Sequence, residues 1–85
     1  TLHFNTVNDD FFHLLKQKYP ELTPNDLKLC AYLKMNLSSK EIARLMNVTT
    51  KAIEIGRYRL RKKLNLDSEV NLYEFLIHVA KEIKI

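Results

Sequence analysis

Helix-start signals recur along this chain and constrain its fold more than any other feature. Thr23, Ser38 and Asn71 are each followed, three residues later, by an acidic side chain. A Thr, Ser or Asn before a helix accepts a hydrogen bond from an early backbone amide, and the acid can bond back. With one glycine, two prolines and no strand-like alternation, the chain is predicted to be all-α, with about five helices.

The N-terminal part is expected to hold two helices. The opening residues 1–6 could be extended, and Asn8 is the candidate cap of a first helix that stops before Pro20. Asp9 and Asp10 would then lie in its positively polarised first turn. The second helix would follow Thr23 and bury one apolar stripe. The residues expected in that stripe are Leu27, Cys30, Ala31, Leu33 and Met35.

The centre of the chain has the spacing of a helix-turn-helix. A two-turn helix after Ser38 is followed by a turn at 47–49 and a longer helix over 50–64, and a last helix is expected over 71–83. At about 100° per residue, Ile53, Leu60 and Leu64 share one side of the longer helix. The opposite side carries polar and basic residues. That helix therefore has one face for a core and one for a partner.

Positive charge is concentrated in this central part. Residues 40–63 hold eight basic and two acidic side chains, whereas residues 1–39 are balanced and residues 64–85 have two more acids than bases. Clustering of this kind indicates a polyanionic partner, although basic blocks on helices are often only solvated surface. Neither a membrane-spanning run nor a secretory leader is apparent. Membrane contact is therefore not expected.

The sequence contains no motif typical of an enzyme or of a metal-binding protein. His3, His13 and His78 have no ligand spacing, and neither a phosphate-binding loop nor a nucleophile motif occurs. We therefore predict a protein that is not an enzyme and binds no cofactor or metal. The single cysteine, Cys30, lies between apolar residues and is predicted to be a buried, inert thiol, consistent with a cytoplasmic location.

Several spaced elements resemble the LuxR/GerE type of bacterial helix-turn-helix regulators. They are "LTPND" at 22–26, "SSKEIA" at 38–43 and "TTKAIEIGRYRLRKKL" at 49–64. The resemblance covers about residues 21–80. It implies a four-helix DNA-binding domain at 21–85 whose third helix reads DNA and whose last helix often makes a dimer contact. Residues 1–20 would be an extension that connects to an upstream sensor or receiver domain.

The resemblance and the helix faces together give candidate site residues. Base readout in double-stranded DNA is expected from Lys51, Glu54, Ile55 and Tyr58. Phosphate contacts are expected among Ser39, Lys40, Thr50, Arg57, Arg59, Arg61, Lys62 and Lys63. A homodimer or domain contact is expected among Leu72, Tyr73, Leu76, Ile77, Ala80 and Ile83. The alternative is that the N-terminal helix of the same chain covers this apolar surface of the last helix.

The chain departs from the family pattern at several positions. Asn36, Asn47 and Asn65 stand where the family usually has glycine after a helix, and asparagine is the next-best residue for a left-handed helix end. Gly56 lies on the core side of the basic helix, where it suggests a close helix contact. Glu54 replaces a common lysine, which leaves the DNA sequence preference open.

Two other functional classes remain open at this point. A sigma-factor region that reads promoter DNA has a similar helix-turn-helix, but it lacks a long apolar final helix such as the one expected at 71–83. A helical protein-interaction module would leave the charge asymmetry unexplained. Binding to a heparin or DNA column would separate the last class from the others.

Overall fold

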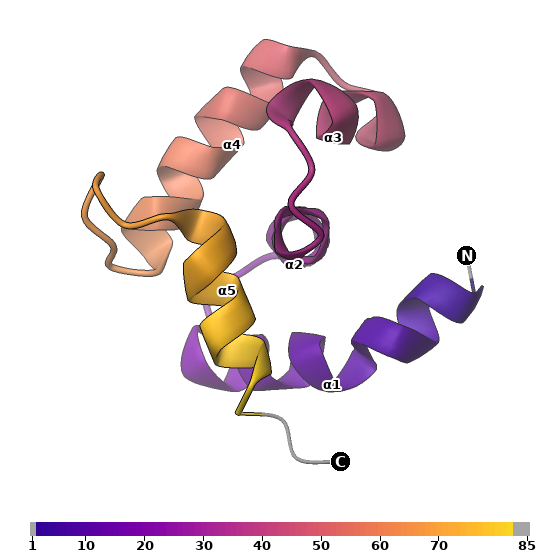
Figure 1. The fold of residues 1–85 in the computed structure, drawn as a ribbon, viewed down its shortest axis with the longest axis vertical. Coiled ribbons are helices and arrows are strands. Elements are labelled where there is room, and N and C mark those ends of the chain that lie inside the picture. Colours follow the sequence, from indigo (N-terminus) through magenta and orange to yellow (C-terminus); the bar gives the residue numbers. More distant parts are fainter. Residues whose placement is uncertain (1, 83–85) are drawn as a thin grey trace.

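The computed structural model describes residues 2–82, with side chains from residue 9 onward. This part of the chain contains five helices and no strand (Figure 1). Their bounds are α1 (Leu2–Lys18), α2 (Pro24–Lys34), α3 (Ser39–Met46), α4 (Thr50–Lys63) and α5 (Leu72–Ala80). The prediction of an all-α fold with a central helix-turn-helix is confirmed.

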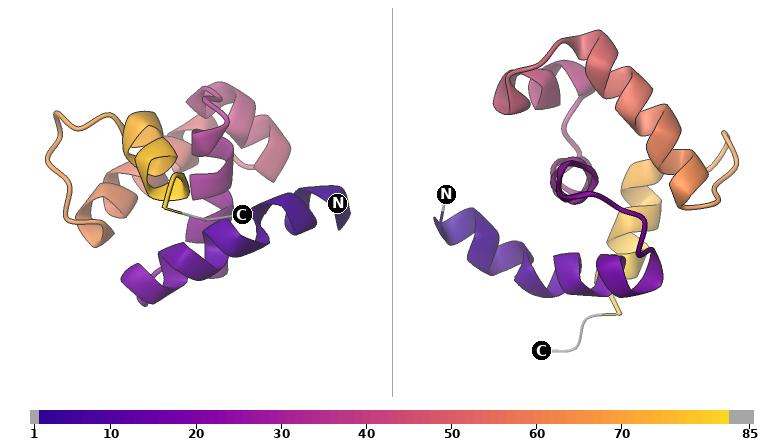
Figure 2. Two further views of the ribbon diagram at one scale, coloured as in Figure 1. Left: turned by 60° about the horizontal axis from the view of Figure 1, so that its bottom comes forward. Right: turned by 180° about the vertical axis from the view of Figure 1, so that it is seen from behind.

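The second helix is the centre of the fold. In Figure 1 α2 is seen end-on, with the other helices arranged around it, and Figure 2 shows the same arrangement from behind. Each of the other four helices packs against α2. Leu29, Cys30, Ala31 and Leu33 are all buried on it. A helix surrounded in this way can hold the helix-turn-helix in a fixed position relative to α1 and α5.

One hydrophobic core includes residues from all five helices. Phe11 and Leu15 of α1 are buried beside residues of α2 to α5. The Lys34 ammonium also lies 4.5 Å from the centre of the Phe11 ring, which adds a cation–π contact between α2 and α1. Burial and, to a smaller extent, the Asp26 charge together raise the pKa of the Cys30 thiol to about 12. Cys30 is therefore protonated at neutral pH, as expected for an inert core thiol.

Three of the predicted helix starts are present at the expected residues, Thr23, Ser38 and Asn71. The Asp26 amide donates to Thr23 Oγ1 at 3.1 Å and the Thr23 amide donates to Asp26 at 2.9 Å. The same reciprocal pair joins Ser38 and Glu41 at the start of α3. At α5 the structure shows one half of the predicted pair, the Glu74 amide donating to Asn71. These local bonds fix where α2, α3 and α5 begin.

Asparagine ends three of the helices, as the sequence predicted. Asn36, Asn47 and Asn65 have φ angles of 62°, 58° and 58°. At each end the next amide reaches back to close the last turn, for example from Val48 to the Ala43 carbonyl at 3.0 Å. Asparagine can therefore provide the left-handed turns for which glycine is the usual residue.

Two expectations for the N-terminal part were wrong. The first helix begins at Leu2, not after Asn8, so that Asp9 and Asp10 lie in its middle. Neither Gly nor Pro interrupts this segment, and an interior Asn costs only about 0.7 kcal/mol. Met35 is 54% exposed rather than part of the buried stripe, because α2 ends there and the chain turns.

Gly56 lies against α2, but the contact does not require glycine. A Cβ atom added to Gly56 would be 3.4 Å from Leu29 Cδ2, which is ordinary van der Waals contact with a movable side-chain end. The close approach inferred from the sequence therefore leaves room for a methyl group. Gly56 also has no positive φ angle.

Replacing Gly56 with alanine is expected to stabilise the domain. The helix propensity gained is about 1 kcal/mol, equivalent to an increase in Tm of about 4–8 °C for a domain of this size. Thermal unfolding followed by circular dichroism measures the change. Ala52→Gly, an exposed position on the same helix, is the reciprocal control and should lower Tm. A lower Tm for Gly56→Ala would mean that Leu29 cannot yield.

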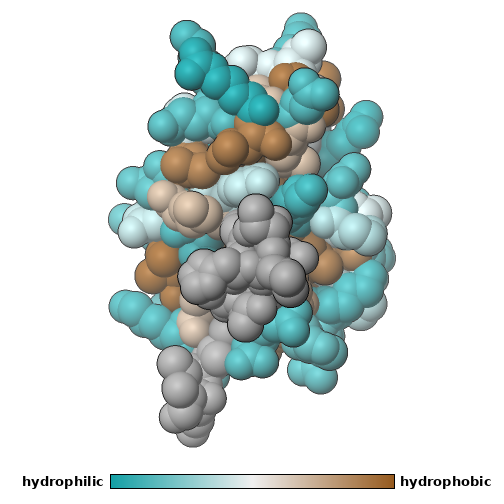
Figure 3. Space-filling model, turned by 90° about the vertical axis from the view of Figure 1, so that its right-hand side faces the viewer, coloured by the Kyte–Doolittle hydropathy of each residue, from teal (hydrophilic) through white to brown (hydrophobic). Residues whose placement is uncertain are grey.

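The surface mixes polar and apolar side chains. On the face shown in Figure 3 the hydrophobic groups form separate patches among hydrophilic ones. Among the described residues, the large hydrophobic side chains with the greatest exposure are Met35, Leu45, Val48, Ile55, Tyr58 and Tyr73. None of the helices in the described part of the chain is long and apolar enough to cross a membrane.

Candidate nucleic-acid interface

The helix-turn-helix consists of α3, the turn at 47–49 and α4. Thr49 caps α4 by accepting a hydrogen bond from the Ala52 amide at 3.0 Å. Ile42 and Ala43 of α3 are buried, as are Ile53 and Leu60 of α4, and the two helices pack together. The predicted inward face of the basic helix is therefore confirmed. Packing of this face fixes which side of α4 points outward.

The outward face of α4 carries the predicted readout residues. Lys51, Glu54, Ile55 and Tyr58 are all exposed, with Ile55 at 42% and Tyr58 at 60%. The Lys62 ammonium lies 4.9 Å from the centre of the Tyr58 ring, so these two side chains form a cation–π pair on this face. The structure thus brings all four readout candidates and Lys62 to one side of one helix. A convex helix face of this kind can enter the major groove of DNA.

A shallow hollow beside α4 joins it to the start of α3. The hollow, about 440 Å³ in volume, is lined by Ser39, Glu54, Arg57, Tyr58, Arg61 and Ser68. Arg57 Nη1 donates to Ser39 Oγ at 3.4 Å. Partial burial lowers the pKa of Arg57, and the charge of Arg61 lowers it further while Glu54 opposes the change. Arginine nevertheless remains charged at neutral pH, so Arg57 brings a cation to the first turn of α3.

Arg61 is occupied inside the domain. Its guanidinium donates to the Asp67 carbonyl at 3.2 Å and also to the Val70 carbonyl. These bonds hold the connection between α4 and α5. Because Arg61 is also only partly exposed, contact with a phosphate would compete with its role in this loop.

Lys63 is occupied by a long-range ion pair. Its ammonium lies 2.6 Å from Asp26 Oδ2, which also accepts a hydrogen bond from the Thr23 backbone amide. Burial by itself raises the pKa of Asp26, but the hydrogen bonds from Lys63 and Thr23 outweigh it and leave the pKa below 3.8. One carboxylate therefore caps α2 and ties α2 to the C-terminal end of α4.

Removing the Asp26 charge is expected to destabilise the domain in a pH-dependent way. Because its folded-state pKa is lowered, Asp26 contributes stability above about pH 3.9, and this contribution is lost as the pH falls through the folded-state pKa. Asp26→Asn should lower the free energy of unfolding by about 1 kcal/mol at pH 7. The difference from the wild type should shrink below pH 3.9 in urea unfolding curves. Glu69→Gln, at an exposed loop position, should change little; a difference constant with pH would contradict the assignment.

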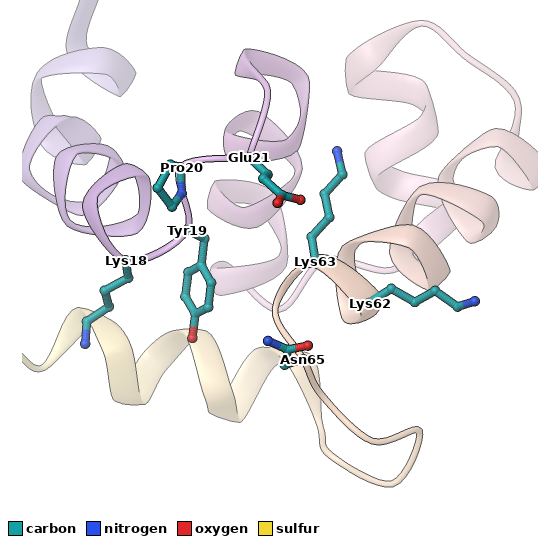
Figure 4. A pocket seen from close by; sticks show the side chains of 7 residues that line it. All are labelled: Lys18, Tyr19, Pro20, Glu21, Lys62, Lys63 and Asn65. Carbon is teal, nitrogen blue, oxygen red and sulfur yellow. The ribbon is translucent and has the colours of Figure 1, made fainter.

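A second hollow lies at the C-terminal end of α4 and is rich in lysine. Figure 4 shows the side chains around it: Lys18, Tyr19, Pro20, Glu21, Lys62, Lys63 and Asn65. Lys18 pairs with Glu82 at 3.1 Å and Lys63 pairs with Asp26. Lys62 points away from the other two lysines (Figure 4) and lies over Tyr58. The lysines therefore do not converge on one point, and the hollow is not a preformed anion site.

The last helix is buried on one side only. Leu72 and Leu76 are 2% and 0% exposed in the core, where α5 packs against α2. Tyr73 is exposed, and Ile77 and Ala80 are half-buried. Of the residues predicted for a dimer or domain contact, Leu72 and Leu76 are therefore core residues instead, whereas Tyr73, Ile77 and Ala80 keep accessible surface. Ile83 lies outside the described residues. The Lys18–Glu82 ion pair connects the ends of α1 and α5.

The structure adds one residue to the sequence-predicted site. Ser68 comes from the connection between α4 and α5 and lines the same hollow as Arg57 and Ser39. Its position depends on the two hydrogen bonds from Arg61 that hold this connection. The sequence carries no local signal for it, because the contact is made by a loop whose path is set by α5.

The fold and this surface define a helix-turn-helix DNA-binding domain. The sequence profile of the bacterial regulatory proteins of the luxR family, GerE, matches residues 20–76. The chain therefore belongs to this family, and the matched residues, which run from before α2 into α5, correspond to its LuxR/GerE-type DNA-binding domain. This membership favours a transcription regulator over a sigma-factor region or a protein-interaction module. A search of curated proteins and of solved structures gave no match.

Proposed function

We propose that this domain binds specific sequences in double-stranded DNA as the output domain of a cytoplasmic transcription regulator, with α4 in the major groove. The observation that carries the proposal is the division of α4 into a buried side and an exposed side. Ile53 and Leu60 anchor the helix, whereas Lys51, Ile55 and Tyr58 face solvent. A helix held in this way presents side chains to base edges without losing its packing.

Phosphate contacts would flank the recognition helix. Ser39 and the first amides of α3 provide hydrogen-bond donors at the positive end of a helix, and Arg57 lies beside them. Lys40, Thr50, Arg59 and Lys62 are exposed and complete the proposed set. Arg61 and Lys63 already have partners within the domain. We therefore assign structural roles to these two residues and leave them out of the proposed set of phosphate contacts. Such contacts fix the register of the protein on the duplex, whereas the base contacts give specificity.

The experiment is a titration of a labelled random-sequence duplex at low and moderate salt. Replacing both Lys51 and Tyr58 with alanine should weaken binding about tenfold, which corresponds to losing about 1.4 kcal/mol of contact free energy. A Lys28→Ala, His13→Ala variant removes an exposed cation and an exposed ring from α2 and α1, and it should bind as the wild type does. Equal weakening by both variants would contradict the assigned face. An absence of binding at low salt would point to a protein-interaction module.

We extend the proposal to the assembly of two copies of this domain into a dimer. Tyr73, Ile77 and Ala80 provide an apolar strip on α5 that a second copy could cover. A dimer of this kind would place two α4 helices about one DNA turn apart, on paired half-sites. Residues 1–20 would link the domain to a sensor or receiver domain. Sedimentation of the domain with a two-half-site duplex tests the dimer, and a 1:1 complex at high protein concentration would exclude it.

A further inference from the structure

Two large apolar side chains are left in solvent on the recognition helix. Ile55 is 42% exposed and Tyr58 is 60% exposed. Within the described residues, neither belongs to the hydrophobic core or to the partly buried side chains that pack against it. Fully burying side chains of this kind is worth about 1.5–3 kcal/mol each. Their exposure therefore leaves binding free energy for a partner that reaches this face of α4.

The residues around this pair indicate what kind of partner it is. Lys51 lies four residues before Ile55, and Lys62 lies four residues after Tyr58, so these side chains follow one another along one face of α4. Lys62 also places its ammonium 4.9 Å from the Tyr58 ring centre. An apolar centre with a cation at each end complements a polyanion that carries an apolar group between its charges.

DNA offers one such group in its major groove. Among the base edges exposed there, the C5 methyl of thymine is the apolar group, and the phosphates on either side are anionic. We infer that α4 recognises thymine through its C5 methyl group, which packs against Ile55 and Tyr58. This inference rests on the proposed function, because it names the base that the DNA-facing surface selects.

The polar atoms next to the apolar pair fit the same base pair. Glu54 lies four residues before Tyr58 on the helix and is exposed. A carboxylate only accepts hydrogen bonds, and the adenine opposite thymine offers its N6 amino group as a donor. Guanine presents two acceptors at this edge, which a carboxylate would repel. Glu54 therefore disfavours guanine but can accept a hydrogen bond from either adenine or cytosine, so the preference for thymine comes from the apolar pair.

Deoxyuridine tests the inference directly, since it lacks the methyl group and keeps the hydrogen-bonding edge of thymine. A preferred duplex is first selected from a random-sequence pool with the whole domain, and each thymine is then replaced in turn by deoxyuridine. At the contacted thymine the substitution should weaken binding about fourfold, the equivalent of about 0.8 kcal/mol for one buried methyl group. Ile55→Ala should weaken binding to the thymine duplex and bind the two duplexes almost equally.

Met35→Ala is the matched control. It also removes an exposed apolar side chain, but from the end of α2 opposite the Asp26–Lys63 pair. This variant should keep the full preference for thymine over deoxyuridine. Wild-type affinity that is unchanged by deoxyuridine at every position would overturn the inference and leave the proposed DNA binding intact. Failure to bind any duplex at low salt would overturn both.

Discussion

Raising the salt concentration from 50 to 200 mM is expected to weaken DNA binding about a thousandfold. Contacts to about six phosphates release their condensed cations, so the logarithm of the affinity should fall with the logarithm of the salt concentration with a slope near −5. The excess of basic side chains over residues 40–63 is the origin of this dependence. Fluorescence anisotropy with one duplex over a series of salt concentrations measures the slope.

Single substitutions test where these contacts lie. Lys62→Gln removes one exposed cation of α4 and should reduce the slope by about one unit, with a similar effect on every duplex sequence. Lys28→Gln, an exposed position on α2, should leave the slope unchanged. An affinity that falls less than tenfold over the same range would mean that the basic surface does not meet phosphates.

Truncating Leu60 is expected to cause the largest loss of stability among the substitutions considered. Its side chain is 0% exposed and lies on the buried side of α4, where α3 and α2 pack. Leu60→Ala should lower the free energy of unfolding by about 2–5 kcal/mol, through lost burial and the cavity left behind. This is a large fraction of the roughly 5–15 kcal/mol typical of a natural domain. Urea unfolding at pH 7 measures the change.

The same helix provides the matched comparison. Ile55→Ala removes an aliphatic side chain from the exposed side of α4 and should change stability by no more than about 0.5 kcal/mol. The two variants should therefore change different properties. Leu60→Ala should reduce the folded population, whereas Ile55→Ala should affect DNA binding. A loss below about 1 kcal/mol for Leu60→Ala would show that α4 is not held by this side.

The helix-turn-helix could be predicted because its signals are local. Thr23 and Ser38 cap helices through bonds to amides three residues away, so a short stretch of sequence contains both partners. At α1 the local signal was misleading, because the expected cap, Asn8, lies inside a helix that begins at Leu2. The helix extends from Leu2, and its residues Phe11 and Leu15 pack into the shared core. This packing depends on α2, which comes later in the chain.

The candidate site also has a part that the sequence predicts and a part that depends on tertiary contacts. Helical periodicity was sufficient to place Lys51, Glu54, Ile55 and Tyr58 on one exposed face of α4. It could not distinguish Lys62, which remains exposed, from its neighbour Lys63, because the partner of Lys63 is Asp26 on another helix. Specific contacts of these side chains with DNA remain predictions.

The sequence by itself determined the all-α class, most of the helix starts and the two faces of α4, since these depend on residues within one or two turns of each other. Only the tertiary structure decided which apolar and basic residues remain available to a partner. Leu72 and Leu76 are buried whereas Tyr73 is exposed, and Arg61 is bonded to the loop that leads to α5. Availability depends on which segments, distant in the sequence, lie against each residue, and periodicity within one helix carries no information about them.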